Sequence, residues 1–365
     1  MRLANANKRD EGEMTTKLVM NVVVVGYGYW GTNLARVFRE LPRAQLYAIV
    51  ELNAQKRELA QQRYPGVKIV EKLEDLLGDP ALDAVAIATQ VDTHFELAMA
   101  ALQAGKHVWV EKPMTETSAQ ARLLVEEAER RKLTLLVDHT FIYSGAVGKM
   151  AEIVANDDFG EVLYYDSMRI NLGLFQRDVN VISDLAVHDF SILQYLLGES
   201  PAAVSASGMT HFEGVPENLA YVSLFYDSGT IAHANVSWLA PVKVRQVLLG
   251  GSKKMIVYDD ISPSEKVKVY DSGVTFTSDP QEIYQRRVGY RTGDVWVPKI
   301  NPTEPLRVAG ENFLQCIETG AAPTTDGRFG LSVVELIEAA TTSMKRRGEA
   351  VHIGVKEKVY DDSVC

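Results

Sequence analysis

Short apolar runs alternate with segments of helical periodicity through the first part of the chain. Residues 17–25 form a β-branched run that ends in a glycine, which is typical of a buried parallel strand. Over residues 32–41 the apolar side chains recur at helical spacing until Pro42 stops the pattern. The same alternation predicts strands at 46–51, 67–70, 85–88, 107–110 and 134–137, and helices at 53–64, 73–77, 94–104 and 118–131. Strands connected through helices in this order predict a doubly wound parallel α/β sheet of the Rossmann type, with right-handed crossovers.

After Tyr143 the pattern changes to consecutive strands with few helices between them. The apolar positions predict helices at 148–156, 183–197, 305–319 and 330–347, and strands at 162–170, 202–210, 218–226, 231–238, 242–250, 254–259 and 350–353. Short turns rich in Gly, Asp and Ser, at 226–229 and 250–252, join some of these strands and favour antiparallel pairing. Residues 260–304 carry no clear pattern. We therefore expect an α+β domain with one large, mostly antiparallel open sheet.

The length of 365 residues is large for a single hydrophobic core, so the two patterns are interpreted as two domains. Residues 1–17 are polar and mixed in charge, and we expect them to be a disordered arm and not a secretory signal. Residues 18–142 are then a nucleotide-binding domain, and residues 143–365 a domain for substrate binding and oligomerisation.

The composition narrows the class of function. A hydrophobic content of 46% with 24% charged residues is typical of a soluble globular protein. The net charge of −10, without a block of Lys and Arg, argues against a nucleic-acid partner and, less strongly, against a membrane surface. It does not exclude a locally basic site for a small anionic ligand. With only Cys316 and Cys365 in the chain, a reducing cytoplasm is a simpler interpretation than a structural disulfide, and no metal site is expected.

A glycine-rich turn, Gly26-Tyr27-Gly28-Tyr29-Trp30-Gly31, lies between the first predicted strand and the first predicted helix. In this position the first glycine permits a tight turn, the second lets the backbone approach a pyrophosphate, and the third allows close packing of helix and strand. The helix N-terminus adds free N–H groups for the anion. The turn and its context favour a bound dinucleotide over an unrelated glycine turn of an α/β protein.

Glu51 ends the second predicted strand, twenty residues after Gly31. A carboxylate there accepts hydrogen bonds from a ribose diol and repels a 2′-phosphate, so NAD is favoured over NADP. The alternative is a solvated strand end without a ligand. Arg57, one helical turn further on, either complicates the choice of cofactor or pairs with Glu51.

Two further groups of residues are candidates for chemistry. Glu111-Lys112-Pro113 follows a buried strand directly, and ligands bind at the carboxyl ends of such strands. Asp184 and His188 are four residues apart in a predicted helix, so a carboxylate can orient an imidazole that acts as a general base. The ordinary alternatives are a surface Glu-Lys pair and a histidine satisfied in a helix–sheet interface.

Taken together, three segments resemble the Gfo/Idh/MocA oxidoreductases, relatives of glucose–fructose oxidoreductase and inositol dehydrogenase. The segments are 26–31, 104–113 and 184–189, and the resemblance extends over residues 18–353. It implies that Lys112 binds the reacting hydroxyl near the nicotinamide, that His188 removes the hydroxyl proton, and that Asp184 is its carboxylate neighbour. It also implies a dimer or tetramer formed through the outer face of the second domain's sheet.

The residues that the turn, its acidic partner and the resemblance together assign to the cofactor are Gly26, Tyr27, Gly28, Tyr29, Trp30, Gly31, Glu51, Thr89, His94, Glu111 and Lys112. Within the family, Tyr27, Trp30 and the segments 169–173, 177–180 and 304–307 look most like members that oxidise the C3 hydroxyl of UDP-N-acetylglucosamine or its uronic acid. Ser183 departs from that subgroup, which usually has a tryptophan before the aspartate, and opens space beside Asp184.

Residues expected to contact substrate are Lys112, Arg169, Arg177, Asp184, His188, Arg245 and Arg307. A guanidinium can bind a diphosphate or a carboxylate through two hydrogen bonds, although each arginine alone is more typical of a surface or a sheet edge. The predicted reaction is reversible hydride transfer between a sugar secondary alcohol and C4 of NAD. His188 is the base, Lys112 stabilises the oxyanion, and Asp184 orients His188. The alternatives are an inositol or free-sugar dehydrogenase and a non-catalytic NAD-binding regulator, which the presence of both Lys112 and His188 disfavours.

Overall fold

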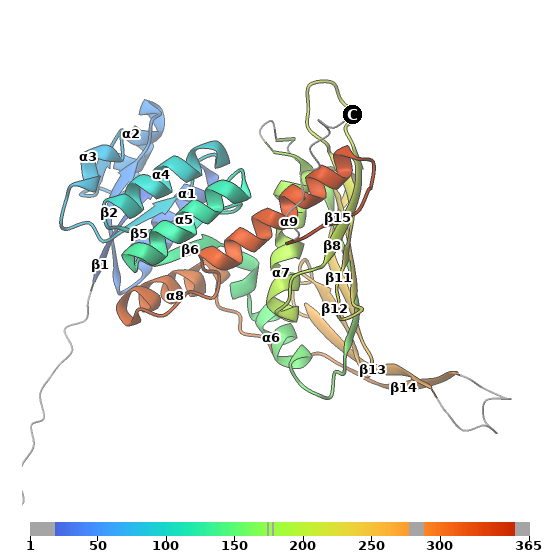
Figure 1. Cartoon of the computed structure of the whole chain (residues 1–365). Coiled ribbons are helices and arrows are strands. Elements are labelled where there is room, and N and C mark those ends of the chain that lie inside the picture. The colour runs from blue at the N-terminus through green and yellow to red at the C-terminus, as the bar shows by residue number, and fades with distance from the viewer. Residues whose placement is uncertain (1–18, 174, 177–178, 277–287, 355–365) are drawn as a thin grey trace, which may run out of the picture.

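The computed structural model describes residues 19–173, 175–176, 179–276 and 288–354. The predicted N-terminal arm, Arg177 and Cys365 lie outside these residues. Two sheets organise the described chain, and helices cover both faces of the first sheet and one face of the second (Figure 1). Within the described residues, no helix is long and apolar enough to cross a membrane.

The first sheet has the strand order β3-β2-β1-β4-β5-β6, and all its pairs are parallel, which confirms the predicted Rossmann arrangement. Its strands are β1 (Met20–Val25), β2 (Ala44–Val50), β3 (Lys68–Val70), β4 (Ala84–Ile87), β5 (His107–Glu111) and β6 (Leu135–Asp138). The helices between them are α1 (Tyr29–Glu40), α2 (Ala54–Arg63), α3 (Glu74–Leu77), α4 (Val91–Gln103) and α5 (Ser118–Arg131). The order reverses between β1 and β4, and the carboxyl edge of the sheet at this point is where a dinucleotide fits.

Local signals in the sequence fix several helix starts in this domain. The Asn53 side chain accepts a hydrogen bond from the Lys56 backbone and so caps α2. Thr117 and Gln120 form a reciprocal capping box at the start of α5. The strand–helix alternation of the sequence is therefore reinforced at its boundaries.

The second sheet, over the described residues, has nine strands in the order β14-β13-β12-β11-β7-β10-β9-β8-β15. Only β7 and β10 pair in parallel, and the other neighbours are antiparallel, as expected for a mostly antiparallel sheet. The strands are β7 (Val162–Leu172), β8 (Ala203–Met209), β9 (Leu219–Phe225), β10 (Ile231–Ser237), β11 (Leu239–Gly251), β12 (Met255–Asp259), β13 (Val267–Phe276), β14 (Val288–Trp296) and β15 (Val351–His352). Strands β13 and β14 extend beyond the rest of the domain and lie in the stretch that carried no clear pattern (Figure 1).

One face of this sheet is covered by helices, and the other is bare. The covering helices are α6 (Gly145–Val154), α7 (Val187–Leu197) and α9 (Gly327–Lys345) (Figure 1). The strand register places Met168, Tyr221, Phe225, Ile231 and Leu248 on the opposite face, where all five are exposed.

The helix predicted at 183–197 is not one continuous α-helix. Residues Ile182–Ala186 form a π-helical turn, and α7 begins only at Val187. A π-turn contains an extra residue per turn, so side chains on either side of it do not keep the angular relation of an α-helix. The prediction that Asp184 and His188 lie on one face of a continuous α-helix therefore does not hold.

The C-terminal helices return to the first domain. The start of α8 (Pro305–Thr319) and its apolar face pack beside α1, where Phe313 contacts the rings of Phe38 and Trp109 at centroid distances of 6.5 Å and 5.7 Å. Just before α9, the Thr325 hydroxyl donates to the Val137 carbonyl and the Val137 N–H donates to the Thr325 carbonyl. Helix α9 then runs from α5 across to β8, so it contacts both domains.

Candidate active site

The three glycines of the turn have the separate roles that their spacing predicts. Gly26 has a φ of +89°, and a Cβ there would lie 2.6 Å from the Ala88 carbonyl oxygen. A Cβ on Gly31 would overlap the Gly26 carbonyl, because α1 starts directly against the end of β1. A Cβ on Gly28 would meet nothing within 4 Å. The open side of the turn is thus at Gly28, where a pyrophosphate can approach the backbone.

Glu51 lies beside this turn and is held by two backbone donors. Its Oε2 accepts a hydrogen bond from the Tyr27 N–H at 2.7 Å, and its Oε1 accepts one from the Asn53 N–H at 2.8 Å. Each carboxylate oxygen has two lone pairs, so both can still accept a hydrogen bond from a ribose hydroxyl. The carboxylate is therefore fixed in place and can still accept hydrogen bonds from a ligand.

Arg57 does not pair with the Glu51 side chain. It donates to the backbone carbonyls of Glu51 and Leu52, at 2.9 Å and 2.6 Å, and forms an ion pair of 3.1 Å with Glu71. The guanidinium therefore closes the end of β2 and leaves the Glu51 carboxylate facing the cleft.

A cleft of about 1270 Å³ runs along the carboxyl edge of the parallel sheet and is bounded by the second domain through Gln176, Val179, Ser183 and Asp184. The sequence-predicted cofactor residues that line it are Gly26, Gly28, Tyr29, Trp30, Glu51, Thr89, His94, Glu111 and Lys112. Tyr27 and Gly31 do not line it. The Tyr27 ring is buried against Tyr64, and only its backbone faces the turn. The cleft is large enough for a dinucleotide and a small substrate together.

His94 is deeply buried in the wall of this cleft, with 1% of its surface exposed. Its Nδ1 lies 3.0 Å from the Pro113 carbonyl oxygen and its Nε2 lies 3.2 Å from the Thr89 carbonyl oxygen. Burial lowers the pKa of His94, although both carbonyls act in the opposite direction. The imidazole thus ties the loop after β4 to the loop that carries Lys112.

Lys112 reaches across the cleft to the second domain. Its Nζ donates to the Asp184 backbone oxygen at 3.0 Å and lies 3.5 Å from Asp184 Oδ1. The other carboxylate oxygen of Asp184 accepts a hydrogen bond of 3.0 Å from Trp238 Nε1. Asp184 therefore positions the ammonium group of Lys112.

The predicted pairing of Asp184 with His188 is not present. The Asp184 carboxylate is occupied by Lys112 and Trp238, and the π-turn between the two residues changes their relative orientation. His188 Nδ1 has no hydrogen-bond partner among the described residues. Its ring lies against Phe141 instead, with 4.8 Å between centroids.

The surroundings of His188 keep its imidazole neutral. Burial lowers the pKa of His188 well below its usual range, and the positive charges of Lys112 and Arg169 lower it further. A neutral imidazole has one nitrogen free to accept a proton. His188 is therefore in the protonation state that a general base requires.

Arg169 is not placed to bind substrate, contrary to the expectation from sequence. Its guanidinium forms two hydrogen bonds to Asp189, at 3.0 Å and 3.3 Å, and only 3% of the residue is exposed. Tyr165 donates to the same carboxylate at 3.1 Å. The Arg169 guanidinium also lies 4.7 Å from the centre of the Phe141 ring, the same ring that contacts His188. Because the Arg169 side chain projects from β7 toward α7, it packs behind the site and does not face the cleft.

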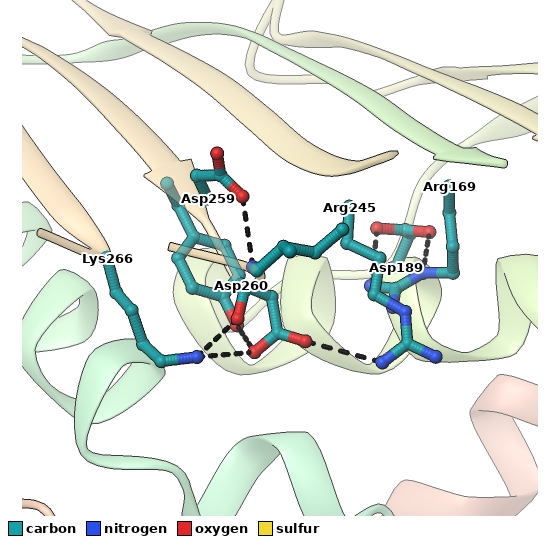
Figure 2. A network of polar contacts seen from close by, with 8 residues as sticks. Arg169, Asp189, Arg245, Asp259, Asp260 and Lys266 are labelled. Atoms are coloured by element: carbon teal, nitrogen blue, oxygen red, sulfur yellow. Dashed lines mark hydrogen bonds and ion pairs between the residues drawn. The ribbon is translucent and has the colours of Figure 1, made fainter. Parts of the chain in front are cut away.

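Arg245 and Asp260 form the second half of the network in Figure 2. Arg245 Nη1 lies 3.4 Å from Asp260 Oδ2, and Asp260 also accepts hydrogen bonds from Tyr258 and Lys266. The Arg245 guanidinium lies 5.9 Å from the centre of the Phe141 ring. Unlike Arg169, its side chain is 35% exposed and so remains accessible to a ligand.

Arg169, Arg245 and Arg307 do not line the cleft. Arg307 forms an ion pair of 3.2 Å with Glu311 on α8. Arg177 lies outside the described residues. Two residues that sequence reasoning missed are Trp238 and Phe141. Nothing near them in the chain indicates a role. Trp238 directly follows β10, and it meets Asp184 because β10 packs against the π-helical turn Ile182–Ala186.

The model of the Gfo/Idh/MocA oxidoreductase family, NAD-binding Rossmann fold, matches residues 20–139. The model of that family's C-terminal alpha/beta domain matches residues 151–353.

Individual relatives share this arrangement at moderate identity. The chain is 25% identical over 361 residues to the scyllo-inositol 2-dehydrogenase (NADP(+)) of Bacillus subtilis, covering 90% of this chain and 94% of that protein. It is 29% identical over 226 residues to the UDP-N-acetylglucosamine 3-dehydrogenase of Acidithiobacillus ferrooxidans, covering 60% and 67%. The solved structure of that second enzyme superposes with a TM-score of 0.75 at 23% identity, covering 90% of this chain and 99% of the other. The two family models together span most of the chain, and the chain belongs to the Gfo/Idh/MocA oxidoreductase family.

Proposed function

We propose that this protein is a dehydrogenase that transfers a hydride between a secondary hydroxyl of a sugar or polyol and NAD. The observation that carries the proposal is the meeting of Lys112 with Asp184 across the cleft that begins at the glycine turn. This contact joins the nucleotide domain to the helix that carries His188. A non-catalytic regulator would have no need for a lysine positioned in this way beside a neutral histidine.

The side chains of the site support one assignment of roles. The Lys112 ammonium donates a hydrogen bond to the reacting oxygen and stabilises negative charge as it develops there. His188 accepts the hydroxyl proton through its free nitrogen, while the hydride leaves the carbon and a carbonyl forms. NAD held along the glycine turn would supply the acceptor for that hydride, at C4 of its nicotinamide. Asp184 acts on Lys112 in this scheme, because its hydrogen bonds lead to Lys112 and not to His188.

The preference for NAD over NADP is proposed from Glu51. Its carboxylate is fixed by two backbone N–H groups and lines the cleft, where a 2′-phosphate would bring a second negative charge against it. Arg57, one of the cations near Glu51, is engaged by Glu71 and two backbone carbonyls, while Lys56 and Lys72 line the cleft.

For the substrate we propose a UDP-N-acetyl sugar or its uronate, oxidised at C3. The similarity to the UDP-N-acetylglucosamine 3-dehydrogenase supports this, and Arg245 is the partly exposed cation near His188 that fits an anionic group. An inositol or free sugar is the second candidate, because two of the inositol dehydrogenases match 90% of this chain, compared with 60% for the UDP-sugar enzyme.

A substrate screen separates these candidates. Purified protein is mixed with NAD and, in turn, UDP-N-acetylglucosamine, its uronate, scyllo- and myo-inositol and free hexoses, and formation of NADH is followed by absorbance. Turnover with a UDP-sugar and none with the inositols is expected. Turnover with inositols alone would replace the first substrate by the second, and binding of NADH without turnover of any secondary alcohol would overturn the enzymatic proposal.

We also propose that the bare face of the nine-stranded sheet joins copies of this chain into a dimer or tetramer. Five large apolar side chains, Met168, Tyr221, Phe225, Ile231 and Leu248, are exposed on this one face. An apolar surface of this kind is unusual on a monomer. Native mass spectrometry tests the proposal, and an oligomer that Leu248→Arg dissociates is the expected result. A monomeric native chain at micromolar concentration would contradict it.

A further inference from the structure

Two buried carboxyl groups lie side by side behind Lys112. Glu111 is the last residue of β5 and Asp138 the last residue of β6, and the parallel register makes them direct neighbours. Glu111 is 6% exposed and Asp138 is 1% exposed. Two carboxylates of the same charge at this depth repel each other and lose their hydration, so something must compensate for the cost.

The hydrogen bonds of these groups leave one oxygen on each without a donor. Asp138 Oδ1 accepts a hydrogen bond of 2.8 Å from the Thr140 hydroxyl. Asp138 Oδ2 and Glu111 Oε1 are buried and have no hydrogen-bond partner among the described residues. Buried acceptors without donors are rare in folded proteins, but a single proton placed between the two carboxyl groups satisfies both.

We propose that Glu111 and Asp138 share one proton, so that the pair carries a single negative charge and acts as a positioning group for the ammonium of Lys112. Lys112 then lies between two anionic partners, the carboxyl pair behind it and Asp184 across the cleft. The shared proton stands independently of the proposed reaction. Only the effect on turnover rests on the proposed function.

The electrostatic surroundings agree with this arrangement. Burial raises the pKa of Glu111 well above its usual range, and the neighbouring Asp138 raises it further. Burial raises the pKa of Asp138 to about 6, while Thr140, Glu111 and Lys112 act in the opposite direction. The other titratable groups that interact with the pair or with Lys112 in this region are His139, Tyr143, His188 and Asp184. His139 and His188 are held neutral by burial and by Lys112, so Lys112 is the cation that faces the pair.

Infrared spectroscopy detects the proton directly. A protonated carboxyl group absorbs separately from a carboxylate, and we expect this band at neutral pH in the wild-type protein. In Glu111→Gln and in Asp138→Asn the new amide donates the hydrogen bond, the remaining acid ionises, and the band disappears. A neutral-pH spectrum without the band, or a band that survives both substitutions, would overturn the proposal.

The dependence of stability on pH gives a second, independent test. A carboxyl group whose pKa is raised by folding binds its proton more tightly in the folded state, so its contribution to stability is present at low pH and is lost as pH rises through the folded pKa. Urea unfolding should show the wild-type free energy of unfolding falling from about pH 4 to above pH 6. The double variant Glu111→Gln/Asp138→Asn should lack this fall. The control Glu127→Gln should keep it, because ion pairs with Arg130 and Arg131 lower the pKa of Glu127 to about 2 and give the opposite slope.

The effect on Lys112 is read from the pH profile of turnover. Each single variant keeps one negative charge beside Lys112, whereas the double variant keeps none. We expect the alkaline limb of the kcat profile to move down by about one pH unit in the double variant only, which is a tenfold change in proton affinity. An equal shift in all three variants would show that the residues have separate structural roles. If no variant or wild-type protein turns over any substrate, the proposed function fails, while the infrared and stability results still decide the shared proton.

Discussion

In the six-stranded parallel sheet, the ionisable residues Glu51, Glu111 and Lys112 lie at the carboxyl ends of the strands and line the cleft. In the nine-stranded sheet, Arg169 lies within β7 and is buried against Asp189 of α7. Ionisable residues therefore have different roles in the two sheets. At a strand end, a side chain can face a ligand, because the backbone hydrogen bonds of the sheet stop there. Within a covered strand, it faces only the next layer of the protein.

This difference distinguishes residues that can bind a ligand from residues that stabilise the fold. At the edge of the first sheet, Glu51 and Lys112 line the cleft and can contact a ligand there. Charges beneath the second sheet must be neutralised by partners inside the protein, and Arg169, Asp189 and Tyr165 do this for one another. Substitutions at the two places should therefore damage different properties, and four sets of substitutions test this.

The largest effect is expected on turnover at the cleft. Lys112→Ala and His188→Ala each remove a group that acts on the reacting oxygen, and we expect kcat to fall by about 10²–10⁴-fold. The affinity for NADH, measured by fluorescence titration, should stay within a few-fold of the wild type. His352→Ala changes an exposed histidine on β15 and serves as the control with normal turnover. Near-normal rates in both variants would remove Lys112 and His188 from the mechanism.

The next effect concerns stability and belongs to the second sheet. Asp189→Asn leaves the buried Arg169 guanidinium without its anion, and the side chains of this pair are 4% and 1% exposed. We expect a loss of about 3–5 kcal/mol in the free energy of unfolding, measured by urea titration. Glu129→Gln, which breaks an exposed pair with Arg328, should cost less than about 1 kcal/mol. Equal losses in the two variants would contradict the distinction between the sheets.

The third substitution tests how the edge of the first sheet selects a cofactor. Glu51→Ala removes the acceptor proposed for the ribose hydroxyls and the charge that repels a 2′-phosphate. We expect NADH to bind about tenfold more weakly, which is about 1.4 kcal/mol, while NADPH binds as well as before or better. Isothermal titration with both cofactors measures this. A variant that keeps the wild-type ratio of the two affinities would show that Glu51 does not discriminate.

The smallest effect is expected where the two domains touch. Trp238→Phe removes the hydrogen bond to Asp184 Oδ2 but leaves the Asp184 backbone contact with Lys112. A loss of about 0.5–1.5 kcal/mol corresponds to a decrease in kcat of about two- to tenfold. Trp109→Phe is the matched control, since the buried Trp109 indole nitrogen has no partner among the described residues and lies away from the cleft. If both variants lower kcat equally, the hydrogen bond is not the cause.

Much of the fold follows from local pattern. The alternation of apolar strands and amphipathic helices predicted the parallel sheet, because each connection is short and its handedness is fixed. Strands β13 and β14 were not predicted, since their residues alternate poorly and the pair extends away from the core. The π-turn at Ile182–Ala186 was missed as well, because one residue more in a single turn leaves the apolar period nearly unchanged.

The sequence predicted those parts of the site whose location follows from the position of a residue at the end of a strand. Strand ends of a parallel sheet gather at one edge, so Gly28, Glu51 and Lys112 were placed correctly in the cleft. The same reasoning would have found Asp138, which ends the strand next to Glu111. The partners of Asp184 and Arg169 were not predictable, because they depend on strand order and side-chain direction in the second sheet. Trp238 is 54 residues from Asp184 in sequence.

The return of α8 and α9 to the first domain bears on how the protein unfolds. Phe313 completes the apolar cluster beneath α1, and Thr325 extends the hydrogen bonding at the open edge of β6. A chain cut near residue 142 would leave both of these surfaces uncovered. The two domains should therefore unfold cooperatively, although the sequence pattern changes between them. Calorimetry of the full chain should record one unfolding transition for both sheets.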